Sequence, residues 1–398
     1  MESSNSPFFK ESSSSGAYHC ANVFVSRNVY LGFQTNTRRL TTISGLIHVL
    51  QVLIGRASFF WDESHDSDFL PEWGMPGKIG ENLAHYPTDA TRDVLPIACH
   101  SHNDYWRRIP LFEAIHYGCT GVEADVWAFD DDLYVGHSQS ALSRNRTFRS
   151  MYVDPLVELL DRQNPKTEFA DVPSPKHGVF DVDSEQTLVL LVDFKTDGYE
   201  TWPYVESQLS ALRDKNYLTY WNGSETVYGA ITVVGTGNTP FDKIVANQTY
   251  RDIFFDAPLD KLWEMPRKTE KPAAVADADA KREVVEDSNQ GQGKKGVPRE
   301  AQFDLSNSYY ASVNFIQTVG LAWKGHLSPA QMDIIRGQIR GAKRRGLKAR
   351  YWGTPEWPIS ARNHVWHVLM KEGADMLNVD DLKSAARLDW RKWRHDWW

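Results

Sequence analysis

Side chains that can transfer protons or bind a hard cation are concentrated between residues 100 and 195. Three carboxylates and an amide oxygen form a ligand set that suits Mg²⁺ or Ca²⁺ better than a thiophilic metal. Two histidines could act as general base and general acid, because the imidazole pKa lies near neutrality, and a lysine could hold a phosphate oxygen as a point charge. The candidates are His100, His102, His137 and Lys195 for proton transfer or phosphate contact, and Asn103, Glu123, Asp125 and Asp193 for one divalent cation, Mg²⁺ or Ca²⁺.

The elements that must position these groups alternate along the chain. Apolar strand-like runs are predicted at 94–100, 121–127, 187–195, 230–237, 252–256, 312–317, 348–353 and 376–381, and helices at 110–117, 154–161, 202–214, 329–345 and 361–372. Such alternation predicts a parallel sheet that is covered on both faces. Eight strands favour a closed (β/α)8 barrel of the TIM type. An open doubly wound sheet is the alternative, although no Gly-rich nucleotide motif follows the first strand.

A barrel of this type carries its active site at the carboxyl ends of the strands. Glu123 and Asp125 lie two residues apart on a predicted strand, so they should share one face. Asp193 and Lys195 repeat that spacing at the end of the third barrel strand. A single carboxylate at a strand end is usually a solvated rim group, whereas catalytic-type groups at several successive strand ends indicate a site.

The domain organisation follows from composition. Residues 1–90 are predicted to be a leader with a disordered, Ser-rich start, and residues 91–398 the barrel, interrupted by a flexible, charged, low-complexity insertion at 265–303.

The apolar segment 43–54 is too short to span a membrane. It is compatible with a signal-like segment, a degenerate anchor or an amphipathic helix, and so with contact at a membrane surface. Membrane association and the secretory pathway both remain open as localisations.

Charge and cysteine content exclude two kinds of protein. The formal net charge of −8 argues against a nucleic-acid binder, which would normally show a basic stripe. Cys20, Cys99 and Cys119 form no CxxC pair, so neither a disulfide framework nor a structural zinc site is predicted. Cys99 and Cys119 fall beside predicted strands and are expected to be buried thiols.

The stretches HSHNDY, PLFEAIHYGC, VEADVW and LYVGHS resemble the superfamily of phosphatidylinositol-specific phospholipases C and glycerophosphodiester phosphodiesterases. Within it, the chain is most similar to the fungal altered-inheritance-of-mitochondria group, which is the only source of a mitochondrial link. The resemblance covers residues 94–195. It implies a phospholipase-C-like barrel and a metal-dependent hydrolase or lyase acting on a lipid or glycerol-type phosphodiester.

The resemblance also implies roles for single residues. His102 and His137 would form the acid–base pair, Lys195 would contact phosphate, and the metal ligands would be Asn103, Glu123, Asp125 and Asp193. The first histidine stays open, because phospholipase C spacing selects His102 and glycerophosphodiesterase spacing selects His100; we favour His102. The P-E-N-T motif of glycerophosphodiesterases is missing, which argues against a close relative of those enzymes.

Two other functions fit parts of the pattern. In a zinc amidohydrolase, His100 and His102 would be the usual metal pair, with Asp380 or Asp381 as a last-strand carboxylate. A non-catalytic barrel that binds lipid head groups is the second alternative. The aromatic residues Tyr105, Trp106, Trp352 and Trp357 either shape a pocket or pack the barrel rim.

Overall fold

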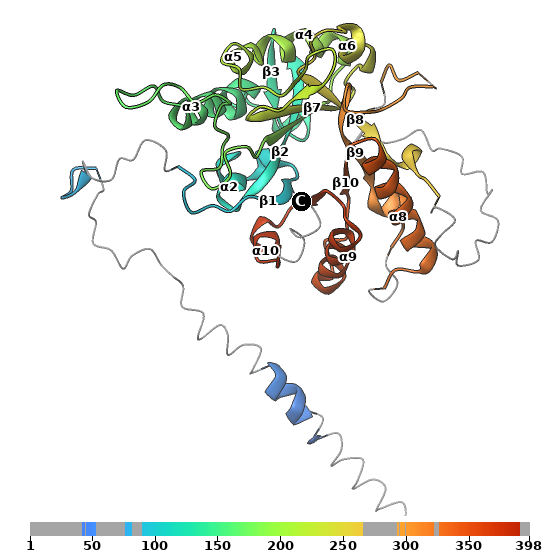
Figure 1. The fold of residues 1–398 in the computed structure, drawn as a ribbon. Coiled ribbons are helices and arrows are strands. Elements are labelled where there is room, and N and C mark those ends of the chain that lie inside the picture. The colour runs from blue at the N-terminus through green and yellow to red at the C-terminus, as the bar shows by residue number, and fades with distance from the viewer. Residues whose placement is uncertain are drawn as a thin grey trace, which may run out of the picture. The chain divides into compact units, whose positions relative to one another are not determined.

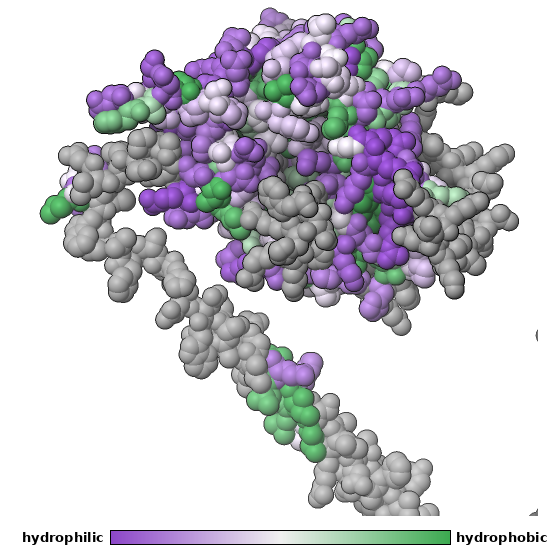
Figure 2. Space-filling model, in the orientation of Figure 1, coloured by the Kyte–Doolittle hydropathy of each residue, from purple (hydrophilic) through white to green (hydrophobic). Residues whose placement is uncertain are grey.

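The computed structural model describes residues 42–43, 45–52, 76–81, 90–265, 293, 295–298, 300–321 and 326–390. The chain divides into two compact units, Met1–His85 and Tyr86–Trp398. In the first unit, residues 42–43 and 45–52 are helical, and apolar side chains such as Leu46 and Leu50 are exposed (Figures 1 and 2). None of the helices formed by the described residues has the length and apolarity to cross a membrane.

Eight parallel strands of the second unit form a closed barrel (Figure 1), which confirms the predicted fold class. The barrel closes because β1 pairs with both β11 and β2. A further strand, β3, extends the end of β2 as an antiparallel hairpin. The bounds are β1 (Ile97–Ser101), β2 (Cys119–Phe129), β3 (Asp132–Val135), β4 (Leu188–Phe194), β7 (Ile231–Gly237), β8 (Ile253–Pro258), β9 (Ser308–Asn314), β10 (Lys348–Trp352) and β11 (Met376–Val379); a separate hairpin joins β5 (Tyr220–Trp221) and β6 (Thr226–Val227).

Helices connect most of the strands and cover the outside of the barrel. The bounds are α2 (Phe112–His116), α3 (Asp154–Gln163), α4 (Gly198–Gln208), α5 (Ser210–Arg213), α6 (Phe241–Ala246), α7 (Phe315–Thr318), α8 (Pro329–Arg344), α9 (Ile359–Glu372) and α10 (Leu382–Ala386). The start of α8 illustrates why these boundaries form. Ser328 caps the helix, Pro329 occupies its first position, and Gln331 completes a capping box.

The strands bury apolar side chains on both faces. On the outer face of β2, Val122, Ala124 and Val126 pack in the main core with the covering helices. Inside the barrel a second apolar cluster contains Leu191 and Phe254. Burying one such large side chain stabilises the fold by roughly 1.5–3 kcal/mol. The two layers hold the carboxyl ends of the strands in fixed positions.

The position predicted for one strand is wrong. Residues 312–317 were expected to be extended, whereas β9 spans Ser308–Asn314 and the helix α7 follows at once. The side chain of Asn314 accepts a hydrogen bond from the backbone N–H of Gln317 at 2.9 Å. This cap turns an apolar run of strand character into a helical turn.

Cys99 and Cys119 are buried as expected, but the expectation that they are free thiols is wrong. Cys99 of β1 and Cys119 of β2 are joined by a disulfide. The two strands are neighbours in the barrel, with Ile97 paired to Cys119. The two cysteines meet because β1 and β2 are neighbours in the sheet, and this produces no local sequence motif such as CxxC.

Most of the predicted insertion, residues 266–292, lies outside the described residues. At the far end of that segment, Phe303 is 5% exposed and packs against Phe241 and Phe255. Gly293 also donates a backbone hydrogen bond to the carbonyl of Asp256 at 3.1 Å. Phe303 is aromatic, whereas the sequence of residues 266–300 contains no aromatic residue.

Candidate active site

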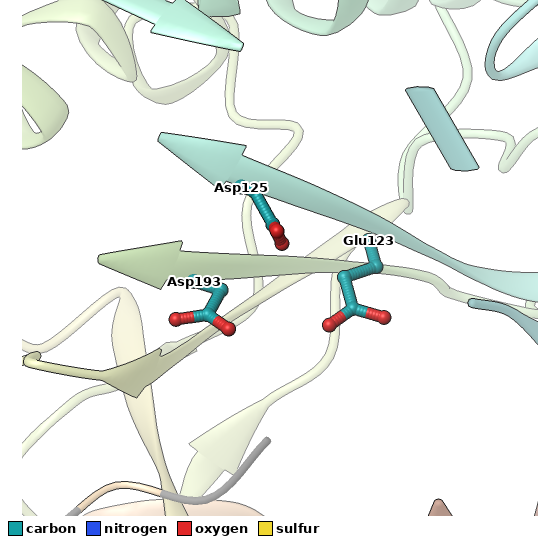
Figure 3. Close-up of side chains that lie close together, drawn as sticks. All are labelled: Glu123, Asp125 and Asp193. Atoms are coloured by element: carbon teal, nitrogen blue, oxygen red, sulfur yellow. The ribbon is translucent and has the colours of Figure 1, made fainter. Parts of the chain in front are cut away.

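Three buried carboxylates meet at the carboxyl ends of β2 and β4 (Figure 3). Glu123 and Asp125 share one face of β2, and Asp193 of β4 pairs in register with Asp125. One oxygen from each side chain lies within 4.8 Å of the other two. The Oδ1 atoms of Asp125 and Asp193 are buried without a hydrogen-bond partner. Such a concentration of buried negative charge requires compensating cations.

Lys195 supplies part of that positive charge. Its Nζ lies 2.6 Å from Asp193 Oδ2 and 3.1 Å from Asp125 Oδ2. Burial alone would lower the pKa of Lys195, but the two carboxylates outweigh it and raise the pKa. Burial also raises the pKa of Asp193 to about 7, against the opposing effect of Lys195. Lys195 is therefore held as a cation beside the cluster.

The remaining donors fit a hard divalent cation. Asn103 adopts a left-handed backbone conformation with φ 47°, which Asn tolerates better than most residues. Its backbone N–H donates to Glu123 Oε2 at 3.3 Å, so the residue lies against the carboxylates. Amide and carboxylate oxygens, two of the latter unpartnered, are the ligands that Mg²⁺ and Ca²⁺ prefer.

His102 follows β1 and contacts the carboxylate cluster. Its Nδ1 is 2.9 Å from Asp380 Oδ1, and its Nε2 is 3.9 Å from Glu123 Oε2. Burial would lower the pKa of His102, but Glu123 and Asp380 outweigh that effect and raise it. Asp380 thus fixes the ring through Nδ1, and Nε2 is the nitrogen nearer Glu123.

His100 lies within β1 and has a different environment from His102. Its Nδ1 is 3.3 Å from the hydroxyl of Tyr310, and its side chain is fully buried. A Cβ atom on Gly121 would lie 2.2 Å from His100 Nδ1, so β2 needs glycine at that point. Burial, with Arg350 and His102, lowers the pKa of His100 well below its usual value. His100 is therefore a neutral ring packed among buried side chains.

His137 lies after β3 and is the more accessible histidine. Its side chain is 40% exposed, and Nδ1 is 3.7 Å from Asp125 Oδ2. The hydroxyl of Tyr105 is 3.1 Å from the same nitrogen, and the ring of Trp106 lies 4.9 Å away between centroids. His137 and His102 therefore contact different carboxylates of the cluster.

Two further residues touch the site: Tyr105, which the sequence offered only as a pocket or rim aromatic, and Arg350, which was not predicted. The hydroxyl of Tyr105 lies 2.7 Å from Asp125 Oδ2 and 2.5 Å from Asn103 Oδ1. Burial and Asp125 raise its pKa, which keeps the phenol neutral. The fully buried Arg350 has Nη2 at 3.5 Å from Glu123 Oε2. A charged residue between the apolar Ala349 and Tyr351 of a barrel strand was the available signal for Arg350.

The aromatic residues considered from the sequence differ in exposure. Tyr105 is buried within the site, whereas Trp106 and Trp357 are 59% and 79% exposed. Trp352 is half-buried at the end of β10.

The histidine pair of a zinc amidohydrolase finds no support, because His100 bonds Tyr310 while His102 bonds Asp380.

Comparison with known proteins identifies the family of this chain. Residues 88–256 match a family described as the AIM6-like phosphodiesterase domain. Over 310 residues the chain is 40% identical to the altered inheritance of mitochondria protein 6 homolog of Arthroderma benhamiae, covering 75% of this chain and 86% of that protein. Proteins named altered inheritance of mitochondria protein 6 are 33% identical over 304 residues in Eremothecium gossypii (75% and 71% covered) and 31% over 313 residues in Saccharomyces cerevisiae (75% and 72%).

No solved structure matches the chain. The matched region contains β1, β2 and β4, the three carboxylates on β2 and β4, and His102 and Lys195, which directly follow β1 and β4. The chain thus carries a phosphodiesterase-type domain, and it belongs to the family of altered inheritance of mitochondria protein 6.

Proposed function

We propose that this protein cleaves phosphoric diesters of lipid or glycerol type with the help of a divalent cation. The observation that carries the proposal is the buried cluster of Glu123, Asp125 and Asp193, contacted by two histidines and a lysine at the carboxyl end of the barrel. The phosphodiesterase-type family supports the reaction class.

His102 and His137 would move the protons. One imidazole takes the proton of the attacking hydroxyl or water as a new oxygen–phosphorus bond forms, and the other gives a proton to the departing oxygen as its bond to phosphorus breaks. The hydrogen bond between His102 Nδ1 and Asp380 Oδ1 holds His102 in a single orientation for this transfer. The product would be cyclic where the substrate has a neighbouring hydroxyl and hydrolysed where water attacks.

Charge compensation would come from the other groups. Glu123, Asp125, Asp193 and Asn103 would hold Mg²⁺ or Ca²⁺, which would neutralise charge on the phosphate oxygens. Lys195, which is 11% exposed, would contact a non-bridging oxygen as a point charge. Tyr105 positions Asn103 and Asp125 through its hydroxyl, and Arg350 supports Glu123 from within the barrel.

A substrate panel tests the proposal. The purified protein is incubated with Mg²⁺ or Ca²⁺ and with inositol lipids, glycerophosphodiesters and sphingolipids, and phosphorus NMR identifies the products. We expect cleavage of at least one diester, and its loss in His137→Ala, whose side chain is exposed enough to be removed without disturbing the core. If wild-type protein cleaves none of these lipids, the proposed function is wrong.

A further inference from the structure

Large apolar side chains stand exposed around the end of the barrel that carries the carboxylate cluster. Trp106 and Ile109 follow β1, and Trp357 precedes α9; their exposed fractions are 59%, 57% and 79%. We call the whole set the apolar rim: Trp106, Ile109, Phe129, Ile316, Leu321 and Trp357.

Every member of the rim lies at the carboxyl end of the barrel. Ile316 and Leu321 follow β9, and Phe129 ends β2 beyond its last pairing with β4. Connections that follow parallel strands emerge at the end where the active site of this fold lies. The rim is therefore contributed by four separate connections around one opening, and Trp106 also contacts His137 there.

The loop Trp106–Ile109 adds positive charge and a rigid base. Arg108 is exposed between the two apolar residues. Arg107, in contrast, donates from Nη1 to the carbonyl of Asp380 at 2.5 Å and from Nη2 to the carbonyl of His102 at 3.1 Å. The exposed tip is thus fixed directly to the residues that flank the carboxylate cluster.

These features match a lipid surface better than a protein groove. The exposed side chains come from separate loops, and tryptophan has an apolar ring with one polar N–H, which suits the boundary between head groups and acyl chains. A guanidinium between two apolar side chains can pair with lipid phosphates while its neighbours insert. Large apolar side chains gathered at one opening favour a binding role over isolated surface exposure.

We propose that the apolar rim docks the mouth of the barrel on a lipid surface, so that the substrate is a phosphodiester lipid presented within a membrane. This inference rests on the proposed function for the identity of the substrate. Docking itself depends only on the rim and is measured separately from turnover.

Binding to vesicles of phosphatidylcholine with a minority of phosphatidylserine tests docking. Ile109→Ala and Trp357→Ala each remove one rim side chain that makes no contact with the carboxylate cluster. Phe169→Ala is the matched control: Phe169 is 90% exposed, and its connection precedes β4 and so lies at the opposite end of the barrel. Sedimentation with the vesicles gives the partition coefficient, and turnover of bis(p-nitrophenyl) phosphate reports on the site without a lipid surface.

We expect Trp357→Ala to lower the partition coefficient about tenfold, which is the loss expected when one large apolar side chain no longer leaves water. Ile109→Ala should lower it by several-fold, and Phe169→Ala should leave it unchanged. Turnover of the soluble diester should persist in all three variants. The inference is overturned if wild-type protein does not bind the vesicles, or if Phe169→Ala loses as much binding as Trp357→Ala. Vesicle binding without any diester cleavage would instead refute the proposed function and leave docking standing.

Discussion

At the scale of single residues, the protonation of each candidate histidine depends on its neighbours in the fold, which are distant in sequence. His100 lies in β1 and His102 directly follows it, and the sequence spacing suits either as the first catalytic histidine. Their environments differ: Tyr310 and Arg350 surround the first, and Glu123 and Asp380 surround the second. An opposite charge stabilises an imidazolium, whereas burial next to a guanidinium disfavours it. These contacts support His102 as the proton-transfer residue in our proposal.

Replacing each histidine should give different defects. We expect His102→Ala to lower kcat for a phosphodiester by about 10²- to 10⁴-fold, the usual contribution of a general acid or base, with little change in melting temperature. His100→Ala should mainly lower the melting temperature, because it opens a cavity beside Tyr310. Steady-state kinetics and thermal unfolding measure the two effects. An inactive but stably folded His100→Ala, alongside an active His102→Ala, would reverse the assignment.

Two adjacent carboxylates offer a second residue-level test. Asp380 bonds His102 Nδ1, whereas Asp381 caps α10 and pairs with Arg362 at 2.7 Å. Asp380→Ala should lower kcat about 10- to 100-fold, as is typical when an orienting partner is lost, and should leave KM nearly unchanged.

Asp381→Ala is the control. It should cost roughly 1 kcal/mol of stability through the lost helix cap and leave kcat intact. Equal kcat values for the two variants would show that the contact between Asp380 and His102 has no part in the reaction.

At the scale of elements, polar contacts inside the barrel tie neighbouring strands together. Arg350 of β10 is fully buried: Nη2 approaches Glu123 of β2, Nη1 lies 3.9 Å from Asp256 of β8, and Nε donates to Asn378 of β11 at 3.1 Å. Burial raises the pKa of Asp256 to about 7, against the opposing effect of Arg350. The guanidinium of Arg350 therefore links β8, β10 and β11 to Glu123 of the carboxylate cluster.

Removing that cation should be costly. We expect Arg350→Met to lower the free energy of unfolding by about 3–5 kcal/mol, because it leaves buried carboxylates unpaired. Arg336→Met is the control: Arg336 of α8 is 49% exposed and pairs with Glu372 of α9, and ion pairs that reach solvent in this way contribute about 0–1 kcal/mol. Urea unfolding of both variants measures the difference. Equal free energies of unfolding for the two variants would show that Arg350 does not stabilise the barrel.

The disulfide between β1 and β2 gives a chemical test at the same scale. Three cysteines are present, and two of them are joined, so one thiol should react with a thiol reagent in denatured, unreduced protein. All three should react after reduction. Three reactive thiols before reduction would show that Cys99 and Cys119 are not bonded in solution.

Periodicity predicted most elements but not their long-range contacts. The runs at 187–195 and 348–353 became β4 and β10 with shifts of about one residue, because apolar strands of a parallel barrel are recognisable locally. The face shared by Glu123 and Asp125 also followed from strand alternation. Tyr105 and Arg350 could not be assigned in this way, because their roles depend on strands distant in sequence.

At the scale of the whole molecule, the candidate catalytic groups of our proposal lie together at the carboxyl end of one barrel. The resemblance in residues 94–195 covered β1 to β4, and the closed sheet brings β10 and β11 next to them, so Arg350 and Asp380 complete the site from the far end of the chain. The loops that would select a substrate lie outside those motifs. Fold and the phosphodiesterase-type family could therefore be predicted from sequence, whereas substrate choice could not.

The most direct test of the proposed reaction is turnover of bis(p-nitrophenyl) phosphate by the purified protein in the presence and absence of divalent cation. We predict turnover with Mg²⁺ or Ca²⁺ that EDTA abolishes and added cation restores, and a large loss in Asp193→Asn, which removes one charge from the carboxylate cluster. Turnover that persists in EDTA, or a tightly bound zinc ion in the active protein, would contradict a hard-cation phosphodiesterase.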